Sequence, residues 1–172
     1  SIIIVDVKTG KYEKIPIDLD GVFTTSWHPF ENKIAFMGHK DDSSDIYIID
    51  LNSDEIINIT NDIFSDSSPS WSPNGKVIYF TSDRGENTNA NNMFDVDFSQ
   101  TDIFQYSLES DAVSQLTNTE YNENYPVADS DGNLYYTADY NGITNIFRHD
   151  LINNEAFPIT NVITGVQQID LD

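Results

Sequence analysis

The sequence contains no cysteine, and this absence excludes several kinds of chemistry. Without a thiol in its 172 residues, the chain cannot form a disulfide scaffold, use a cysteine nucleophile or bind zinc through thiolates. Long apolar runs are also missing. The longest aliphatic stretch, Ile2 to Val5, is far shorter than the ~20 residues that a membrane-spanning helix requires. We therefore expect no membrane insertion.

Positive charge is scarce. Eight Lys and Arg residues stand against 29 Asp and Glu residues, which gives a formal net charge of −21. After Arg84 the only basic residue is Arg148. Nucleic acids and anionic lipid surfaces are bound through clustered Lys and Arg side chains. We therefore expect no nucleic-acid partner, while the strong negative charge favours cationic partners.

Helical periodicity is absent, and a repeated strand pattern is present instead. An acidic or amide residue followed by alternating aliphatic and aromatic residues begins at Asp45, Asp102 and Asn145, and Ser1 begins a more aliphatic copy. Successive copies start 44, 57 and 43 residues apart. Period-2 alternation over four to eight residues is typical of β-strands.

A second marker follows the first one along the chain. An aliphatic residue followed by Thr-Asn occurs with its threonine at Thr60, Thr117 and Thr160, with spacings of 57 and 43 residues. Because two independent markers share the same irregular spacing, the chain contains a true repeat with one insertion.

A third marker completes the repeating unit. Trp27 and Trp71 precede a turn and a β-branched or aromatic run, Ala128 holds the same position in the next copy, and the count places Leu171 in the one after. Pro69 and Pro126 coincide at the expected entrance of this strand. Four short strands in each repeat of about 40–45 residues are typical of a β-propeller blade. We therefore predict an all-β chain, with a propeller favoured over a sandwich.

The motif Ser-Trp-Ser-Pro-Asn-Gly-Lys-Val-Ile-Tyr-Phe-Thr-Ser-Asp-Arg, from Ser70 to Arg84, resembles the TolB-like, WD-repeat-like blade motif. The segment from Tyr136 to Phe147 is similar to the same motif. The resemblance implies an extracytoplasmic bacterial propeller, periplasmic or secreted, that serves as a protein-interaction module. Related propellers also form the gating domains of oligopeptidases.

The strand phase predicts a partial ring of four-stranded antiparallel blades. We expect half a blade in residues 1–20, three full blades in 21–62, 63–120 and 121–162, and the first strand of another blade in 163–172. A partial ring of this kind would leave strand edges unpaired, and soluble proteins usually avoid such edges. We therefore expect the chain to be a segment of a longer polypeptide or one half of an assembly.

The insertion near 85–101 is the first candidate site, and three interpretations remain open for it. Oxygen ligands at Asp95, Asp97 and Asp102 would suit Ca²⁺. The loop can instead contact a partner, or it can be a flexible polar excursion. The residues of the partner-contact interpretation are Asn91, Asn92, Phe94, Asp95 and Asp97.

Catalytic patterns are missing. His28, His39 and His149 fall at three different positions of the repeat, and the chain has no nucleophile elbow or phosphate loop. We predict Trp27 and Trp71 as core between blades, and no catalytic residues and no cofactor other than the calcium candidate.

The leading hypothesis is a non-catalytic scaffold that binds a protein, a peptide or a glycan, and the remainder of its own propeller. The alternative is a gating domain of an oligopeptidase-type hydrolase, or part of a propeller lyase, with the catalytic residues outside this chain.

Overall fold

The computed structural model describes residues 1–85 and 98–171, and every sheet within them is antiparallel. A two-stranded sheet pairs β1 (Ile2–Val5) with β2 (Tyr12–Ile15). Three four-stranded sheets follow in chain order. They consist of β3 (Gly21–Trp27), β4 (Lys33–Lys40), β5 (Ser43–Asp50) and β6 (Glu55–Asn58); β7 (Asp66–Trp71), β8 (Val77–Ser82), β9 (Asp102–Ser107) and β10 (Ala112–Gln115); and β11 (Glu123–Ala128), β12 (Asn133–Ala138), β13 (Asn145–Asp150) and β14 (Glu155–Pro158). A 3₁₀ turn, η2 (Tyr140–Gly142), links β12 to β13.

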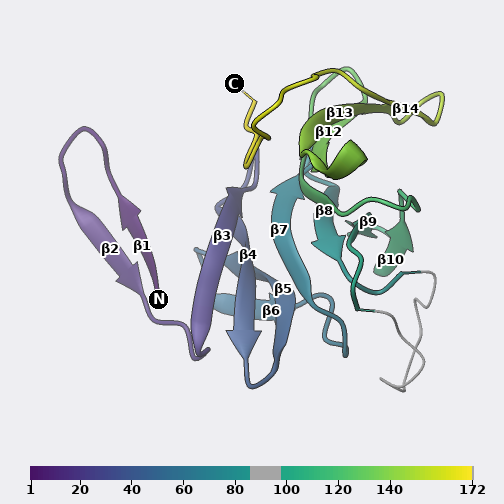
Figure 1. The fold of residues 1–172 in the computed structure, drawn as a ribbon. Helices are drawn as coiled ribbons and strands as arrows, with labels where there is room; N and C mark the ends of the chain where they lie inside the picture. The colour runs from purple at the N-terminus through teal and green to yellow at the C-terminus, as the bar shows by residue number, and fades with distance from the viewer. Residues whose placement is uncertain (86–97, 172) are drawn as a thin grey trace.

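The sheets lie one after another along an arc that does not close (Figure 1). The three complete sheets fall within the ranges 21–62, 63–120 and 121–162, and the insertion joins β8 to β9. In each sheet the strands follow chain order from the inner to the outer edge. This arrangement is that of propeller blades, so the predicted all-β propeller architecture is confirmed. No helix among the described residues is long and apolar enough to cross a membrane.

The hairpin that joins the last two strands of each sheet needs a residue in the left-handed conformation at one position. Gly10, Asp54, Asp111 and Asn154 hold this position, with φ between 51° and 69°. Glycine adopts this conformation freely, and Asp and Asn tolerate it better than other residues do. The acidic and amide residues of these turns are therefore explained by backbone geometry.

The two sequence markers are joined by hydrogen bonds, which explains why they keep the same spacing. The hydroxyl of each marker threonine accepts a hydrogen bond from the residue that follows the acidic or amide residue of the first marker, in the third strand of the same sheet. In two sheets it also donates to that acidic or amide residue itself, at 3.3 Å to Asp45 and 3.1 Å to Asn145. The accepted bonds join Thr60 to Ile46, Thr117 to Ile103 and Thr160 to Ile146, at 3.0, 2.8 and 2.9 Å.

The apolar core lies between neighbouring sheets. Trp71 on β7 is 6% exposed and packs in one cluster with Ala35 of β4 and Ile48 of β5. The prediction of inter-blade core is confirmed for Trp71 but wrong for Trp27, which is 53% exposed. The sheet before β3 contains only β1 and β2, so Trp27 has no counterpart of β4 to pack against.

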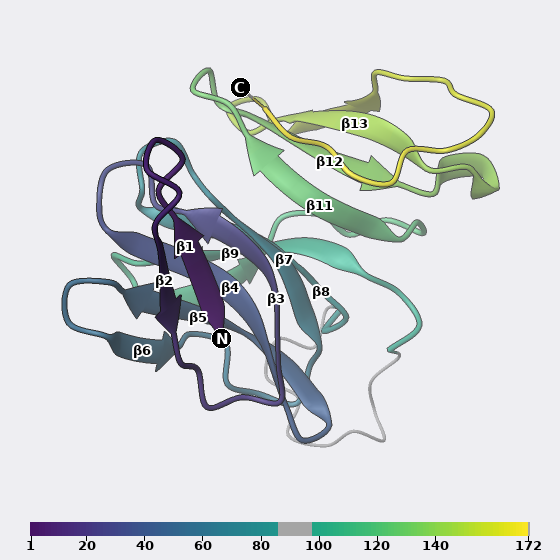
Figure 2. The same cartoon turned by 90° about the vertical axis from the view of Figure 1, so that its left-hand side faces the viewer.

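The C-terminal segment differs from the prediction. Residues 163–171 form no strand, because no described strand pairs with them. They nevertheless keep the register of the repeat. Val166 N donates to Thr144 O at 2.9 Å, as Glu123 N donates to Thr101 O at 2.8 Å one repeat earlier. The segment therefore lies where a first strand would lie, beside β11 (Figure 2).

Candidate binding cleft on the inner strands

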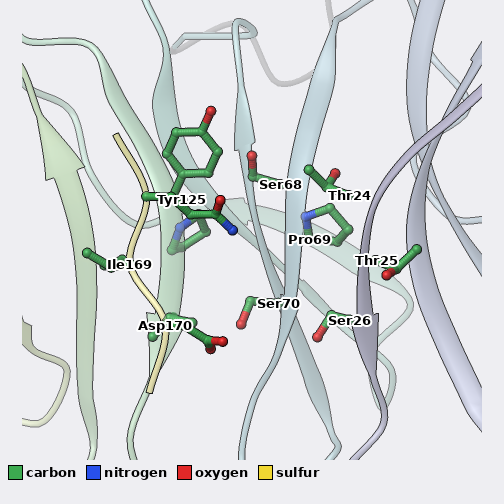
Figure 3. A pocket seen from close by; sticks show the side chains of 12 residues that line it. Thr24, Thr25, Ser26, Ser68, Pro69, Ser70, Tyr125, Ile169 and Asp170 are labelled. Atoms are coloured by element: carbon green, nitrogen blue, oxygen red, sulfur yellow. The ribbon is translucent and has the colours of Figure 1, made fainter. Parts of the chain in front are cut away.

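A polar cleft lies where the inner strands of successive sheets converge. Strand β7 contacts β3 on one side and β11 on the other, and all three strands border the cleft together with the C-terminal segment (Figure 3). The cleft has a volume of about 220 Å³. In a closed propeller the first strands of the blades surround the central channel, so this cleft corresponds to part of the channel wall.

The same three positions of each repeat line the cleft. They are the third, second and first residues before the tryptophan position, and each copy contributes all three. The lining residues are Thr24, Thr25 and Ser26; Ser68, Pro69 and Ser70; Tyr125, Pro126 and Val127; and Gln168, Ile169 and Asp170. The repeat thus builds the cleft from one register of the sequence.

A β-bulge at each inner strand shapes the cleft. The pairing register shifts in β3, β7 and β11, and the shift coincides with positive φ angles of 20°, 52° and 56° at Thr24, Ser68 and Tyr125. A bulge places two residues opposite one and re-aims the local side chains. Pro69 and Pro126 follow two of these residues, so they lie at the bulges inside β7 and β11, where a missing N–H is tolerated, and not at the strand entrances.

The cleft lining is almost entirely uncharged. Hydroxyl groups predominate, Asp170 is the only charged residue among the lining positions, and no Lys, Arg or His lines the cleft. Tyr125 is 37% exposed, and its ring is directed along the cleft (Figure 3). Ser26 Oγ accepts a hydrogen bond from Trp71 N at 3.1 Å and so joins β3 to β7. Such a surface can offer hydrogen bonds and one aromatic face to a ligand.

A buried arginine network lies beside the second complete sheet. Arg84 binds both carboxylate oxygens of Asp66, at 2.7 and 2.8 Å, and Asp62 at 2.9 Å. Its guanidinium also lies 5.1 to 5.5 Å from the ring centroids of Phe64, Phe80 and Phe104. Because Arg84 is only 2% exposed, this network is a structural joint and is not an accessible binding site.

The same network occupies the one acidic cluster that could hold a metal ion among the described residues. Asp45, Asp62 and Asp66 bring carboxylate oxygens within 4.8 Å of one another. The positive charge that such a group needs is already supplied by Arg84. We therefore interpret the cluster as an ion-pair network and do not assign a metal to it.

Of the predicted calcium ligands, the structure places Asp102. This residue begins β9 and is buried. Its carboxylate accepts hydrogen bonds from Gln115 Nε2 at 3.2 Å and Thr119 N at 3.4 Å, and burial raises its pKa. Asp102 thus fastens the turn after β10, as Asp45 does one repeat earlier. Asn91, Asn92, Phe94, Asp95 and Asp97 lie outside the described residues, so the calcium and partner-loop hypotheses stay predictions.

Two of the histidines, His28 and His149, have structural roles. His28 Nδ1 accepts hydrogen bonds from Phe30 N at 3.1 Å and Glu31 N at 2.9 Å, while Nε2 lies 3.2 Å from Gly75 O in the next sheet. His28 therefore closes its own turn and joins two sheets. His149 Nε2 lies 2.9 Å from Asn154 Oδ1 within one hairpin.

Comparison with known proteins agrees with this geometry. The sequence pattern described as TolB beta propeller domain matches residues 1–93. The chain belongs to the TolB β-propeller family. An uncharacterized protein of Agrobacterium fabrum is 24% identical over 123 residues, which cover 72% of this chain and 37% of that protein.

Solved structures share the fold. The crystal structure of TolB from Acinetobacter baumannii aligns with a TM-score of 0.69 and 23% identity, covering 92% of this chain and 37% of that chain. Puromycin hydrolase aligns with a TM-score of 0.69 and 9% identity, covering 95% of this chain and 26% of that chain. This TolB-family chain therefore spans less than half the length of each of these three proteins, and at such identities the likeness concerns the fold.

The sequence pointed to Pro69 and Pro126 as residues that set the approach of a strand, but it did not predict the cleft or the arginine network. Most of the cleft residues are Ser, Thr and Pro, which carry no chemical motif. Counting back from the tryptophan position would have found them, because the three positions recur in all four copies. Arg84 was visible as the end of the Thr-Ser-Asp-Arg motif, but its acid partners precede it by 18 and 22 residues.

Proposed function

We propose that this TolB-family chain is part of a non-catalytic, extracytoplasmic propeller that binds a protein, peptide or glycan partner through the inner-strand cleft. The observation that carries the proposal is the cleft itself. Its lining comes from one repeated register, is rich in hydroxyl groups and includes the exposed ring of Tyr125. Rigid repeats that present variable side chains on one surface are a common design for binding proteins.

The chemistry of the cleft favours a partner with hydrogen-bonding groups and positive charge. Hydroxyl groups can pair with peptide amides or with sugar hydroxyls, and an aromatic ring adds stacking area at low entropic cost. The single carboxylate of Asp170 and the net charge of −21 attract cations. Family membership supports an extracytoplasmic location, which fractionation of cells that express the full-length protein would test.

Binding arrays test this function. The full-length protein is applied at low salt to arrays of cationic and neutral peptides and of glycans, and its best ligand is titrated against variants. We expect Tyr125→Ala to weaken binding by about tenfold or more, the loss that corresponds to about 1.4 kcal/mol. Tyr12→Ala is the matched control, because Tyr12 is 72% exposed on β2 and is not among the residues that line the cleft. Equal affinities of the wild type and Tyr125→Ala, or no ligand at all, would contradict the proposal.

A second candidate function is the propeller of a hydrolase. The observation that favours it is the alignment with puromycin hydrolase over 95% of this chain. In that case the cleft would admit or exclude substrates, and the reaction would occur elsewhere. Hydrolysis of short peptides by the full-length protein, lost when its nucleophile is replaced but kept in Tyr125→Ala at high substrate concentration, would favour this function over simple binding.

A further inference from the structure

One buried carboxylate between the second and third complete sheets has no counter-ion. Glu123 is the first residue of β11 and is 1% exposed. Its backbone N–H donates to Thr101 O at 2.8 Å, and its Oε1 accepts a hydrogen bond from the Thr119 hydroxyl at 3.1 Å. The second oxygen, Oε2, is buried with no hydrogen-bond partner. A buried polar atom without a partner is costly, and an ionised one more so.

The preceding repeat has an acidic residue at the same position, and there the charge is compensated. Asp66 lies five residues before Trp71, as Glu123 lies five residues before Ala128. Both oxygens of Asp66 are bound by Arg84, the last residue of the Thr-Ser-Asp-Arg motif. The same motif in the next repeat ends in Tyr140, so the third complete sheet has the acid but not the arginine.

The surroundings of Glu123 supply no replacement cation. Among the residues that the structure describes, ion pairs are formed by Lys33 with Glu31 and by Arg84 with two aspartates. The charged and titratable groups that act on Glu123, or on which it acts, are Asp102 at the start of β9 and Tyr136 on β12. The Asp102 carboxylate repels a charge on Glu123, and Tyr136 is neutral near pH 7 because burial raises its pKa.

Burial and the nearby Asp102 carboxylate therefore favour the protonated form of the Glu123 side chain. Burial is the main cause that raises the pKa of Glu123 to about 7, and Asp102 adds to it, while the hydroxyls of Thr117 and Thr119 act in the opposite direction. The next repeat has Val166 at this position, with the same backbone hydrogen bond to Thr144 O. An uncharged side chain thus fits this joint.

We propose that Glu123 is a proton-controlled joint between the second and third complete sheets. Glu123 is on β11, a strand that contacts β8 and β9 of the neighbouring sheet. When protonated, its side chain is a neutral group buried at this junction. When ionised, it places an uncompensated charge beside Asp102 and loosens β11. Because Tyr125 lies on the same strand, the part of the cleft that β11 forms loosens with it.

The direction of the pH effect follows from proton linkage. An unfolded glutamate titrates near pH 4.3, so between that pH and about 7 the folded chain holds a proton that the unfolded chain has lost. Stability contributed by Glu123 is complete below the unfolded pKa and is lost as the pH rises through the folded pKa. In this interval the unfolding equilibrium constant rises with a slope that approaches about tenfold per pH unit from this group alone.

Glu123→Gln tests the proposal, because it keeps the shape and removes the titration. Denaturant unfolding is measured from pH 5 to pH 8.5 for the wild type, Glu123→Gln and the control Glu120→Gln, whose side chain is exposed. Asp62, Asp66 and Asp102 also have raised pKa values because of burial, and they contribute to the pH dependence of stability in every variant. The difference between the stability profiles of the wild type and Glu123→Gln therefore isolates the contribution of Glu123. We expect the ratio of the unfolding constants of wild type and Glu123→Gln to rise with pH by tenfold or more. Glu120→Gln should follow the wild type.

Two further measurements keep the test decisive. The carboxyl carbon of Glu123 in the wild type, followed by NMR, should titrate near pH 7, and this readout does not require the variant to fold. Hydrogen exchange at the Glu123 amide should accelerate with pH beyond the intrinsic chemical trend. Parallel stability profiles, or a carboxyl that titrates below pH 5, would overturn the proposal.

Discussion

At the scale of single residues, the repeat is held together by polar groups that connect one sheet to the next. Arg84 joins Asp62, at the end of one repeat, to Asp66, at the start of the following one. His28 reaches Gly75 across the same boundary, between the first and second complete sheets. Glu123 occupies the corresponding place without a partner for Oε2. The strength of each boundary thus depends on whether a buried charge is compensated.

Arg84→Met tests this view at the strongest joint. Removing the guanidinium leaves Asp66 buried without a counter-charge, which typically costs about 3–5 kcal/mol of unfolding free energy. Denaturant unfolding should show this loss, and Arg84→Met combined with Asp66→Leu should recover much of it, because the double variant removes both members of the most deeply buried ion pair. Lys76→Met serves as the control, since Lys76 is exposed and surface changes rarely exceed about 0.5 kcal/mol. A loss as small as that of the control would mean that the network contributes little.

At the scale of elements, the hairpins between third and fourth strands depend on one left-handed residue. Asp54 has a φ of 60°, and among the described contacts its backbone N–H binds Asp50 O at 2.9 Å while no side-chain hydrogen bond is formed. Asp54→Gly should therefore raise the unfolding free energy by up to about 1 kcal/mol, because glycine adopts this conformation without steric cost. Asp54→Ala should lower it. Thermal unfolding of the three proteins gives the order directly, and a glycine variant less stable than the alanine variant would refute the turn argument.

The elements also show how far sequence reasoning extends. Strand order and the place of the insertion could be predicted, because alternation and turn residues are local signals that recur in register. The exposure of Trp27 and the missing strand in 163–171 could not, because both depend on which neighbouring sheet is present to pack or pair with them. The cleft was missed for a related reason. The shape of the cleft depends on the β-bulges at Thr24, Ser68 and Tyr125. A bulge arises from the pairing between two strands, so a single strand's sequence does not reveal it.

At the scale of the whole molecule, charge is the dominant feature. The net charge is −21. Among the described residues, the surface has one ion pair that offsets some of this charge, between Lys33 Nζ and Glu31 at 2.6 Å. Such pairs contribute little to stability, whereas self-repulsion of a large net charge opposes the compact state. The cationic counterpart that would relieve this repulsion is therefore expected from the solvent or from a partner.

Salt should consequently stabilise the protein. The Debye length falls from about 30 Å at 0.01 M to about 10 Å at 0.1 M, so repulsion between exposed carboxylates weakens over this range. The buried Arg84 pair is shielded from solvent ions and should change little. We expect the denaturation midpoint, measured in urea, to rise with NaCl and to level off near a few hundred millimolar. Replacing the exposed Asp41 and Asp42 by Asn should reduce the slope, because fewer charges remain to be screened. A midpoint that falls with NaCl would show instead that attractive surface pairs outweigh the net repulsion.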